Sequence, residues 1–334
     1  MKIVVRTPNW IGDTILALPA IENLKKNFPQ AQIWMATIER VKDLFTSPDS
    51  AEGIISLPNL TELRNLRDFT QKLKEFDFDI GLLLTNSFSS AFLFYLAKIP
   101  ERWGYQSDGR GILLTKGVPL KEEEDSCHQV NYYLDLISGL GLRTRQLEIN
   151  LPLYQEEKEA ARKKLLSLSL DLSRPLIILS PGAYYGPAKR WPASHFAGLA
   201  TLFQKRKAAE IIIVGSSDEI ELGESVASFM KKKPVIFTGK TTLRELLGLI
   251  SQAALFVTND SGPMHMANAL KVPVVAIFGP TNPKVTGPFQ QPSTIIKKDV
   301  ACWPCSYRKC PYDHRCMMRI EPEEVFEISQ NFLG

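Results

Sequence analysis

Three loops in this sequence carry residues that can bind an anion or move a proton. The first, TNDSGPMH at 258–265, follows the apolar run Ala254–Val257 and opens a helix-like segment. Where a strand ends and a helix starts, several backbone N–H groups lack partners and the positive end of the helix dipole is exposed. Such a place favours a phosphate or a carboxylate. The alternative is a simple N-cap, because Asp260 and Ser261 are both capping residue types.

The second loop, SPGAYYGPAKRWP at 180–192, follows the strand-like run Leu176–Leu179. It is long for a connection between a strand and a helix, which usually takes two to six residues. Its glycines, including Gly182, allow close approach of the backbone, and Lys189 with its neighbour Arg190 can bind anions. The alternative is a surface loop with solvated basic residues.

The third loop follows the strand-like run Lys2–Arg6 and contains a single glycine, Gly12. A dinucleotide-binding turn needs G-x-G-x-x-G here, so a nicotinamide-binding domain is not expected. Asp13 is either the N-cap of the following helix or a carboxylate that takes a proton from an attacking hydroxyl. A further turn, at 215–219, offers Asp218 or Glu219 to a ribose hydroxyl.

Short apolar runs alternate with amphipathic segments of helical length along the whole chain. Strands are expected at Lys2–Arg6, Gln32–Ala36, Gly53–Leu57, Ile80–Leu84, Leu176–Leu179, Ile211–Val214, Val235–Phe237, Ala254–Val257 and Val274–Phe278. This alternation predicts an α/β fold with parallel sheets covered on both faces. The 334 residues suggest two domains, which we place at 1–160 and 170–320. A helix within 321–334 is expected to pack back across them. A ligand would lie in a central cleft, at the carboxyl ends of the strands.

Composition excludes several classes of protein. The chain is 44% hydrophobic and 23% charged, which is ordinary for a globular protein. It has no run of 18 apolar residues and no signal-peptide pattern, so we expect a cytoplasmic protein. The net charge of +4 lies in residues 297–319, which hold six Lys or Arg and two Asp or Glu. That patch is too small to predict nucleic-acid binding.

Four of the five cysteines lie close together near the C-terminus. They are Cys302, Cys305, Cys310 and Cys316, with His314 between the last two. Four thiolates, or three with His314, can form a tetrahedral structural zinc site. The spacing is not that of a standard zinc knuckle. Reduced thiols that only pack, and redox or disulfide chemistry, therefore remain alternatives.

Taken together, the motifs resemble the bacterial heptosyltransferases of lipopolysaccharide core assembly, glycosyltransferase family 9. They are WIGD at 10–13, NSF at 86–88, SPGA at 180–183, GPAKRWP at 186–192, and TNDSG at 258–262 with His265. The resemblance covers nearly the whole chain and is strongest to the type II enzymes. It implies the GT-B fold of two Rossmann-like domains. It also implies metal-independent, inverting transfer of L-glycero-D-manno-heptose from ADP-heptose to the first heptose of Kdo2-lipid A.

The resemblance also implies roles for single residues. Asp13 would be the catalytic base, and Lys189 would neutralise the departing diphosphate, which the N–H groups around Ser261 and Gly262 would also hold. Asp260 would orient heptose hydroxyls or the helix start, and His265 would stay near the phosphates. The expected donor-binding set is Ser180, Gly182, Lys189, Asp218, Glu219, Thr258, Asp260, Ser261, Gly262 and His265. No cofactor would be required for catalysis, because lysine and a helix dipole already supply positive charge.

By elimination, we expect the first half of the chain to bind the acceptor. Polar residues there follow strands or lie in long loops. The expected acceptor-binding residues are Asn86, Ser87, Arg102 and His128. A lipid-linked acceptor would bring the enzyme to the inner membrane as a peripheral protein. The alternatives are a type I or other ADP-heptose-dependent transferase, a sugar-nucleotide 2-epimerase, and a non-catalytic zinc-bearing nucleic-acid-binding protein.

Overall fold

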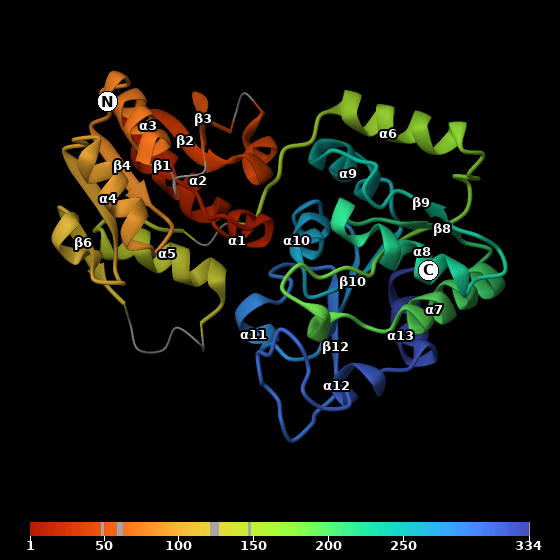
Figure 1. Cartoon of the computed structure of the whole chain (residues 1–334). Coiled ribbons are helices and arrows are strands. Elements are labelled where there is room, and N and C mark those ends of the chain that lie inside the picture. The colour runs from red at the N-terminus through yellow and green to blue at the C-terminus, as the bar shows by residue number, and fades with distance from the viewer. Residues whose placement is uncertain (48–49, 59–62, 121–126, 146–147, 334) are drawn as a thin grey trace. The chain divides into compact units, whose positions relative to one another are not determined.

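The computed structural model describes residues 1–47, 50–58, 63–120, 127–145 and 148–333, which form two compact units (Figure 1). The first unit is Met1–Pro152 and the second is Leu153–Gly334. The charged helix α6 (Gln155–Ser167) packs against α9 (Leu243–Ile250) and belongs to the second unit. None of the described helices is long and apolar enough to cross a membrane.

The first unit contains a six-stranded parallel sheet in the order β3-β2-β1-β4-β5-β6. Its strands are β1 (Lys2–Arg6), β2 (Gln32–Ile38), β3 (Gly53–Leu57), β4 (Ile80–Leu83), β5 (Glu101–Gln106) and β6 (Lys116–Pro119). The central strands are buried along nearly their whole length, as expected for a parallel sheet covered by helices on both faces. Arg6 pairs with Leu83, so the loops that follow β1 and β4 start side by side.

Helices connect these strands. They are α1 (Ile11–Leu16), α2 (Leu18–Asn27), α3 (Leu63–Glu75), α4 (Phe88–Leu96) and α5 (Gln129–Gly139), with 3₁₀ segments η1 (Glu39–Phe45) and η2 (Arg110–Leu113). The segment between β1 and β2 forms two helices that meet at Ala17. Pro19 lies in the first turn of α2, a position where proline is tolerated because its missing N–H would have no helical partner.

The second unit repeats the plan in a sheet of order β12-β11-β10-β7-β8-β9. Its strands are β7 (Leu176–Ser180), β8 (Glu210–Ile213), β9 (Val235–Ile236), β10 (Leu255–Asn259), β11 (Val274–Phe278) and β12 (Ser293–Lys297). Numbered along the chain within each unit, both sheets have the strand order 3-2-1-4-5-6. The nine strands expected from the sequence are confirmed, and β5, β6 and β12 are additional.

The remaining elements of the second unit surround this sheet. They are α7 (Ala193–Lys207), α8 (Ile220–Ser228), α10 (Gly262–Ala269), α11 (Pro283–Thr286), α12 (Arg315–Met318) and α13 (Pro322–Ser329), with η4 (Pro187–Lys189), η5 (Ser217–Glu219) and η6 (Gln330–Phe332). The helix expected within 321–334 is α13, which packs against α7 of the same unit. Phe326 of α13 and Phe203 of α7 meet in the core with ring centroids 5.2 Å apart.

Candidate functional site

The strand order of the second sheet reverses between β7 and β10. Open α/β sheets bind their ligands at such a switch point, outside the carboxyl ends of the strands. Ser180, the last residue of β7, pairs with Thr258 of β10, and both side chains are buried. The loop at 181–192 and the start of α10 therefore emerge side by side, which brings together the two motifs for which the sequence predicts anion binding.

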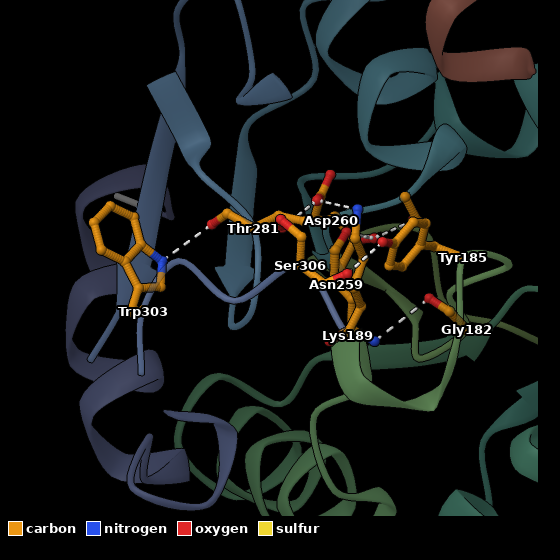
Figure 2. Close-up of polar contacts among 10 residues, drawn as sticks. Gly182, Tyr185, Lys189, Asn259, Asp260, Thr281, Trp303 and Ser306 are labelled. Carbon is orange, nitrogen blue, oxygen red and sulfur yellow. Dashed lines mark hydrogen bonds and ion pairs between the residues drawn. The ribbon is translucent and has the colours of Figure 1, made fainter. Parts of the chain in front are cut away.

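A buried ion pair occupies this switch point. The ammonium group of Lys189, in η4, pairs with Asp260, which directly follows β10 (Figure 2). The two residues are only 9% and 5% exposed. The hydroxyl of Thr281 donates a hydrogen bond of 2.7 Å to the same carboxylate oxygen, and the Lys189 nitrogen lies 4.7 Å from the centroid of the Tyr185 ring. Buried charges persist only when they are paired, so the site holds a positioned cation.

Asp260 does not cap helix α10. The N-cap is Ser261, and among the described residues no side chain makes a capping hydrogen bond at this helix start. The N-cap interpretation of Asp260 is therefore wrong, because its carboxylate is engaged by Lys189 and Thr281. Ser261 and Gly262 are partly exposed, whereas His265 is buried in the helix. A helix start without a side-chain cap suits an anion from outside the chain.

Asn259, the last residue of β10, holds both ends of the lysine loop. Its amide nitrogen donates to the Pro181 carbonyl at 2.7 Å, and its amide oxygen accepts from the Trp191 backbone N–H at 3.0 Å. The side chain is completely buried. A buried amide is stable only when its polar atoms are paired, so Asn259 fixes the loop that carries Lys189. The residue lies inside the TNDSG motif, but sequence reasoning gave it no role.

Glu219 and Asp218 lie in the turn after β8. The Glu219 carboxylate accepts hydrogen bonds from the Ser216 backbone N–H and hydroxyl, at 2.9 and 3.0 Å. A Cβ added to Gly182 would lie 2.0 Å from the other oxygen of Glu219, so the lysine loop needs glycine there. Asp218 is exposed. Of the two carboxylates, Glu219 is the one that lies against the lysine loop.

Asp13 lies near the switch point of the first sheet, between β1 and β4. It is half-buried in the first turn of α1, whose N-cap is Trp10, so the N-cap interpretation of Asp13 is wrong. The phenol of Tyr133 on α5 is buried, and its pKa is raised well above the ordinary value, first by burial and then by the charge of Asp13. The effect of the Asp13 charge on Tyr133 was not predicted from the sequence.

Three of the expected acceptor-binding residues, Asn86 and Ser87 after β4 and His128 before α5, make hydrogen bonds within the chain. The amide nitrogen of Asn86 donates to the Tyr132 hydroxyl at 2.7 Å. Ser87 is the N-cap of α4, with its hydroxyl 3.4 Å from the backbone N–H of Ser90. His128 is the N-cap of α5 through its Nδ1 atom. Ser87 and His128 thus have capping roles, and the Asn86 amide is anchored by its tyrosine partner.

Arg102 was expected after a strand or in a long loop, and that placement is wrong. It lies inside β5, opposite Gly81 near the amino end of β4. Its guanidinium donates to the backbone carbonyls of Leu113 at 2.6 Å and Ile99 at 2.5 Å. Arg102 therefore lies near the amino ends of the strands, whereas the switch-point loops lie at the carboxyl ends. Nothing in its contacts supports acceptor binding.

Arg110 is a residue that sequence reasoning missed. It is completely buried and donates to the carbonyls of Tyr105, at 2.8 Å, and of Thr85, with the Asn86 amide oxygen at 3.4 Å. Burial lowers its pKa to about 10, which still leaves it charged at neutral pH. Arg110 ties the loop after β4 to the end of β5. No periodic pattern in the sequence around Arg110 predicts that this residue is buried.

Similarity to known proteins extends over the whole chain. The model of glycosyltransferase family 9 (heptosyltransferase) matches residues 66–315. The chain belongs to this family. Lipooligosaccharide heptosyltransferase 2 of Campylobacter jejuni is 32% identical over 100% of the chain and 98% of the relative. Lipopolysaccharide heptosyltransferase 2 of Escherichia coli is 30% identical over 89% of the chain and 88% of the relative.

Solved structures agree with the family assignment. The structure described as E. coli ADP-heptose lipopolysaccharide heptosyltransferase II has a TM-score of 0.87 and 28% identity, covering 100% of this chain and 98% of that one. The expected fold class, two Rossmann-like parallel-sheet units of the GT-B type, is confirmed. The expected enzyme class, a glycosyltransferase, is confirmed by the family. Lipopolysaccharide heptosyltransferase 1 of Pseudomonas aeruginosa is 24% identical.

The cysteines of this heptosyltransferase-family chain form a cluster in space as well as in sequence. One small pocket beside Ala188 is lined by all four thiols and His314, and none of the thiols is in a disulfide. Within the described part of the chain, no three His, Cys, Asp or Glu side chains are grouped closely enough to hold a metal ion, and the structural zinc site stays a prediction. Burial, followed by the three other thiols, raises the pKa of Cys316 to about 11.

Proposed function

We propose that this chain transfers heptose from ADP-heptose to the first heptose of the lipopolysaccharide inner core, with inversion at the anomeric carbon. The relatives named heptosyltransferase 2 support this activity, because they share 29–32% identity with the chain. Relatives named heptosyltransferase 1 and 3 share 24%. The second heptose addition is thus favoured over the first and the third.

The observation that carries the proposal is the buried Lys189–Asp260 pair beside the start of α10. As the bond between the sugar and the diphosphate breaks, negative charge accumulates on the diphosphate. A cation already held in place stabilises that charge without reorganisation during the reaction. We assign the diphosphate to Lys189 and to the backbone N–H groups of Ser261 and Gly262. Their exposure fits a ligand that enters from solvent.

We assign the ribose to Glu219 rather than Asp218. The Glu219 carboxylate lies against Gly182 in the lysine loop and is oriented by Ser216. The exposed Asp218 has no such support. A carboxylate after the second strand of a Rossmann-like unit is well placed for a ribose hydroxyl.

We assign the proton transfer to Asp13. Its carboxylate takes the proton from the acceptor hydroxyl, and the acceptor oxygen forms the new bond to the anomeric carbon. The bond from that carbon to the diphosphate oxygen breaks at the same time, and ADP leaves with the electron pair. We place the acceptor sugar near Asn86, because its half-buried amide is held by Tyr132 at the same switch point.

The proposed acceptor is a membrane lipid, so we propose that the enzyme works as a peripheral protein at the membrane surface that displays this lipid. This step rests on the acceptor alone. Binding to vesicles with and without heptosylated Kdo2-lipid A tests it directly. Binding that does not depend on the acceptor lipid would contradict it.

The activity is tested by incubating the protein with ADP-heptose and either Kdo2-lipid A or its mono-heptosylated form. We expect ADP release and a product one heptose heavier only with the heptosylated acceptor. Product from Kdo2-lipid A itself would indicate the type I reaction instead. Change of the donor without an acceptor would indicate an epimerase, and the absence of all three reactions would refute the proposal.

A further inference from the structure

The cysteine segment, residues 302–316, contacts the donor site from two directions. We propose that this segment positions the Lys189–Asp260 pair, so that its residues act on donor binding through that pair. The inference rests on the proposed function, in which the pair binds the diphosphate of the donor. It gives a role to a stretch for which the sequence offered only a cluster of thiols.

The first connection leads from the cysteine segment to Asp260. The indole N–H of Trp303 donates to the Thr281 carbonyl at 3.1 Å, and the Thr281 hydroxyl donates to the Asp260 carboxylate at 2.7 Å. The backbone N–H groups of Cys305 and Ser306 both donate to the carbonyl of Pro280, at 3.1 and 2.9 Å. The segment therefore fixes the short loop that presents Thr281 to the ion pair.

The second connection leads to Lys189. The Tyr185 hydroxyl donates to the Ser306 carbonyl at 2.5 Å. The centroid of the Tyr185 ring lies 4.7 Å from the Lys189 nitrogen and 5.3 Å from the Arg308 guanidinium carbon. A cation over an aromatic face is held electrostatically, so the orientation of this ring helps to set the position of the lysine ammonium.

Backbone contacts reinforce the second connection. The Ala188 N–H donates to the Arg308 carbonyl at 3.1 Å, and the Ala188 carbonyl lies 2.8 Å from Nε2 of His314. Since a carbonyl can only accept, this histidine nitrogen carries the proton. A Cβ added to Gly186 would lie 2.3 Å from the Arg308 carbonyl oxygen. The residue before Lys189 is thus held on both sides by the cysteine segment.

The two connections together form one continuous chain of contacts that begins and ends in the cysteine segment. It runs from Trp303 through Thr281 to the Asp260–Lys189 pair and back through Tyr185 to Ser306, three residues from its start (Figure 2). A displacement of about 1 Å in a catalytic group can lower the rate by about a hundredfold. Contacts that restrain the Lys189 ammonium from both sides are therefore expected to affect donor binding and transfer.

The test uses Tyr185→Phe and Trp303→Phe, which each delete one hydrogen-bond donor and keep an aromatic ring. We expect each to weaken ADP binding, measured by calorimetry, by about threefold to tenfold, the range given by one neutral hydrogen bond. The melting temperature should change little, because Tyr185 is exposed and Trp303 is only half-buried. Tyr307→Phe is the matched control, since this exposed tyrosine lies in the same segment. It should bind ADP like the unsubstituted protein.

A second measurement separates positioning from a merely structural role. If Tyr185 acts through the lysine, Tyr185→Phe should have no further effect on ADP binding in a Lys189→Met background, because coupled residues are not additive. An effect that persists in this background, or normal ADP binding by both single variants, would overturn the inference. Failure of the unsubstituted protein to bind ADP would instead refute the proposed function.

Discussion

The two switch points of this chain have the same architecture but different electrostatics. Both sheets have the strand order 3-2-1-4-5-6, and in both the loops after the first and fourth strands carry polar residues. In the second unit, Lys189 is paired with one carboxylate beside an uncapped helix start. In the first unit, the buried guanidinium of Arg110 donates its hydrogen bonds to uncharged oxygens of β5 and of the loop after β4.

This difference separates the two tasks of a transferase. The buried Lys189 lies near the partly exposed helix start at Ser261 and Gly262, where a diphosphate can approach it, whereas a cation surrounded by carbonyl groups can only shape the loops around it. The first unit offers instead the half-buried carboxylate of Asp13. The same fold thus provides anion binding in one unit and proton transfer in the other, according to which charges are left accessible.

The largest effect that this comparison predicts is on Asp13. Asp13→Asn keeps the size of the side chain and removes its basicity, so transfer should fall by about 10²–10⁴-fold, the usual contribution of a general base. ADP binding should stay within about twofold, because the proposed diphosphate site lies in the second unit. Transfer assays and calorimetry on the same preparation measure both. Near-normal transfer by Asp13→Asn would show that the base lies elsewhere.

Lys189→Met tests the second switch point. Transfer should fall by about 10²–10³-fold, as when one preorganised donor to a developing anion is removed. Unlike Asp13→Asn, this change should weaken ADP binding as well. The free energy of unfolding should also fall by about 3–5 kcal/mol, because Asp260 would be left buried without its partner. Denaturant unfolding measures the second effect.

Two controls sharpen this prediction. Lys284→Met removes an exposed lysine of the same unit and should alter neither ADP binding nor stability. The double variant Lys189→Met with Asp260→Asn removes both charges. It should regain much of the lost stability while transfer stays low, since the cation is still missing. If Lys189→Met alone were as stable as the unsubstituted protein, Lys189 would not be needed to balance the buried charge of Asp260.

Sequence reasoning located the second switch point better than the first. Asp260 directly follows one apolar strand and Lys189 lies in the loop after another, so their loops had to meet at the carboxyl ends of a parallel sheet. Arg102 was misplaced because Glu101–Gln106 mixes charged and aromatic residues and does not read as a buried strand. Arg110 and the contacts of the cysteine segment depend on which loops pack together. No local periodicity encodes that information.

Arg110→Met is expected to act mainly on stability. Three acceptor groups would lose their donor inside the protein, which should lower the free energy of unfolding by about 2–4 kcal/mol. Because Asn86 would lose one of its supports, the KM for the acceptor should also rise. Arg102→Met is the matched control at the opposite edge of the sheet: it should destabilise the protein without changing that KM. If Arg110→Met and Arg102→Met changed the acceptor KM equally, Arg110 would have no special role in acceptor binding.

The smallest expected effect concerns Cys316 and the pH dependence of stability. Its pKa is about 11 in the folded protein against 9.0 ordinarily, so the folded state keeps a proton that the unfolded chain loses between these values. Its contribution to stability is therefore present below pH 9 and lost as the pH rises through 11, by no more than about 3 kcal/mol. Cys316→Ala should flatten the slope of unfolding free energy over this range, and Cys127→Ala, in the first unit, should not.

The direction of this pH effect also distinguishes the interpretations of the cysteine cluster. A metal ion would hold the thiols as thiolates and lower their pKa values, so stability would be lost as the pH falls rather than as it rises. Loss on the acid side, together with about one metal ion per chain by elemental analysis, would require the thiols to close around an ion. Loss on the alkaline side alone would mean that the Cys316 thiol stays protonated in the folded protein and is not a metal ligand.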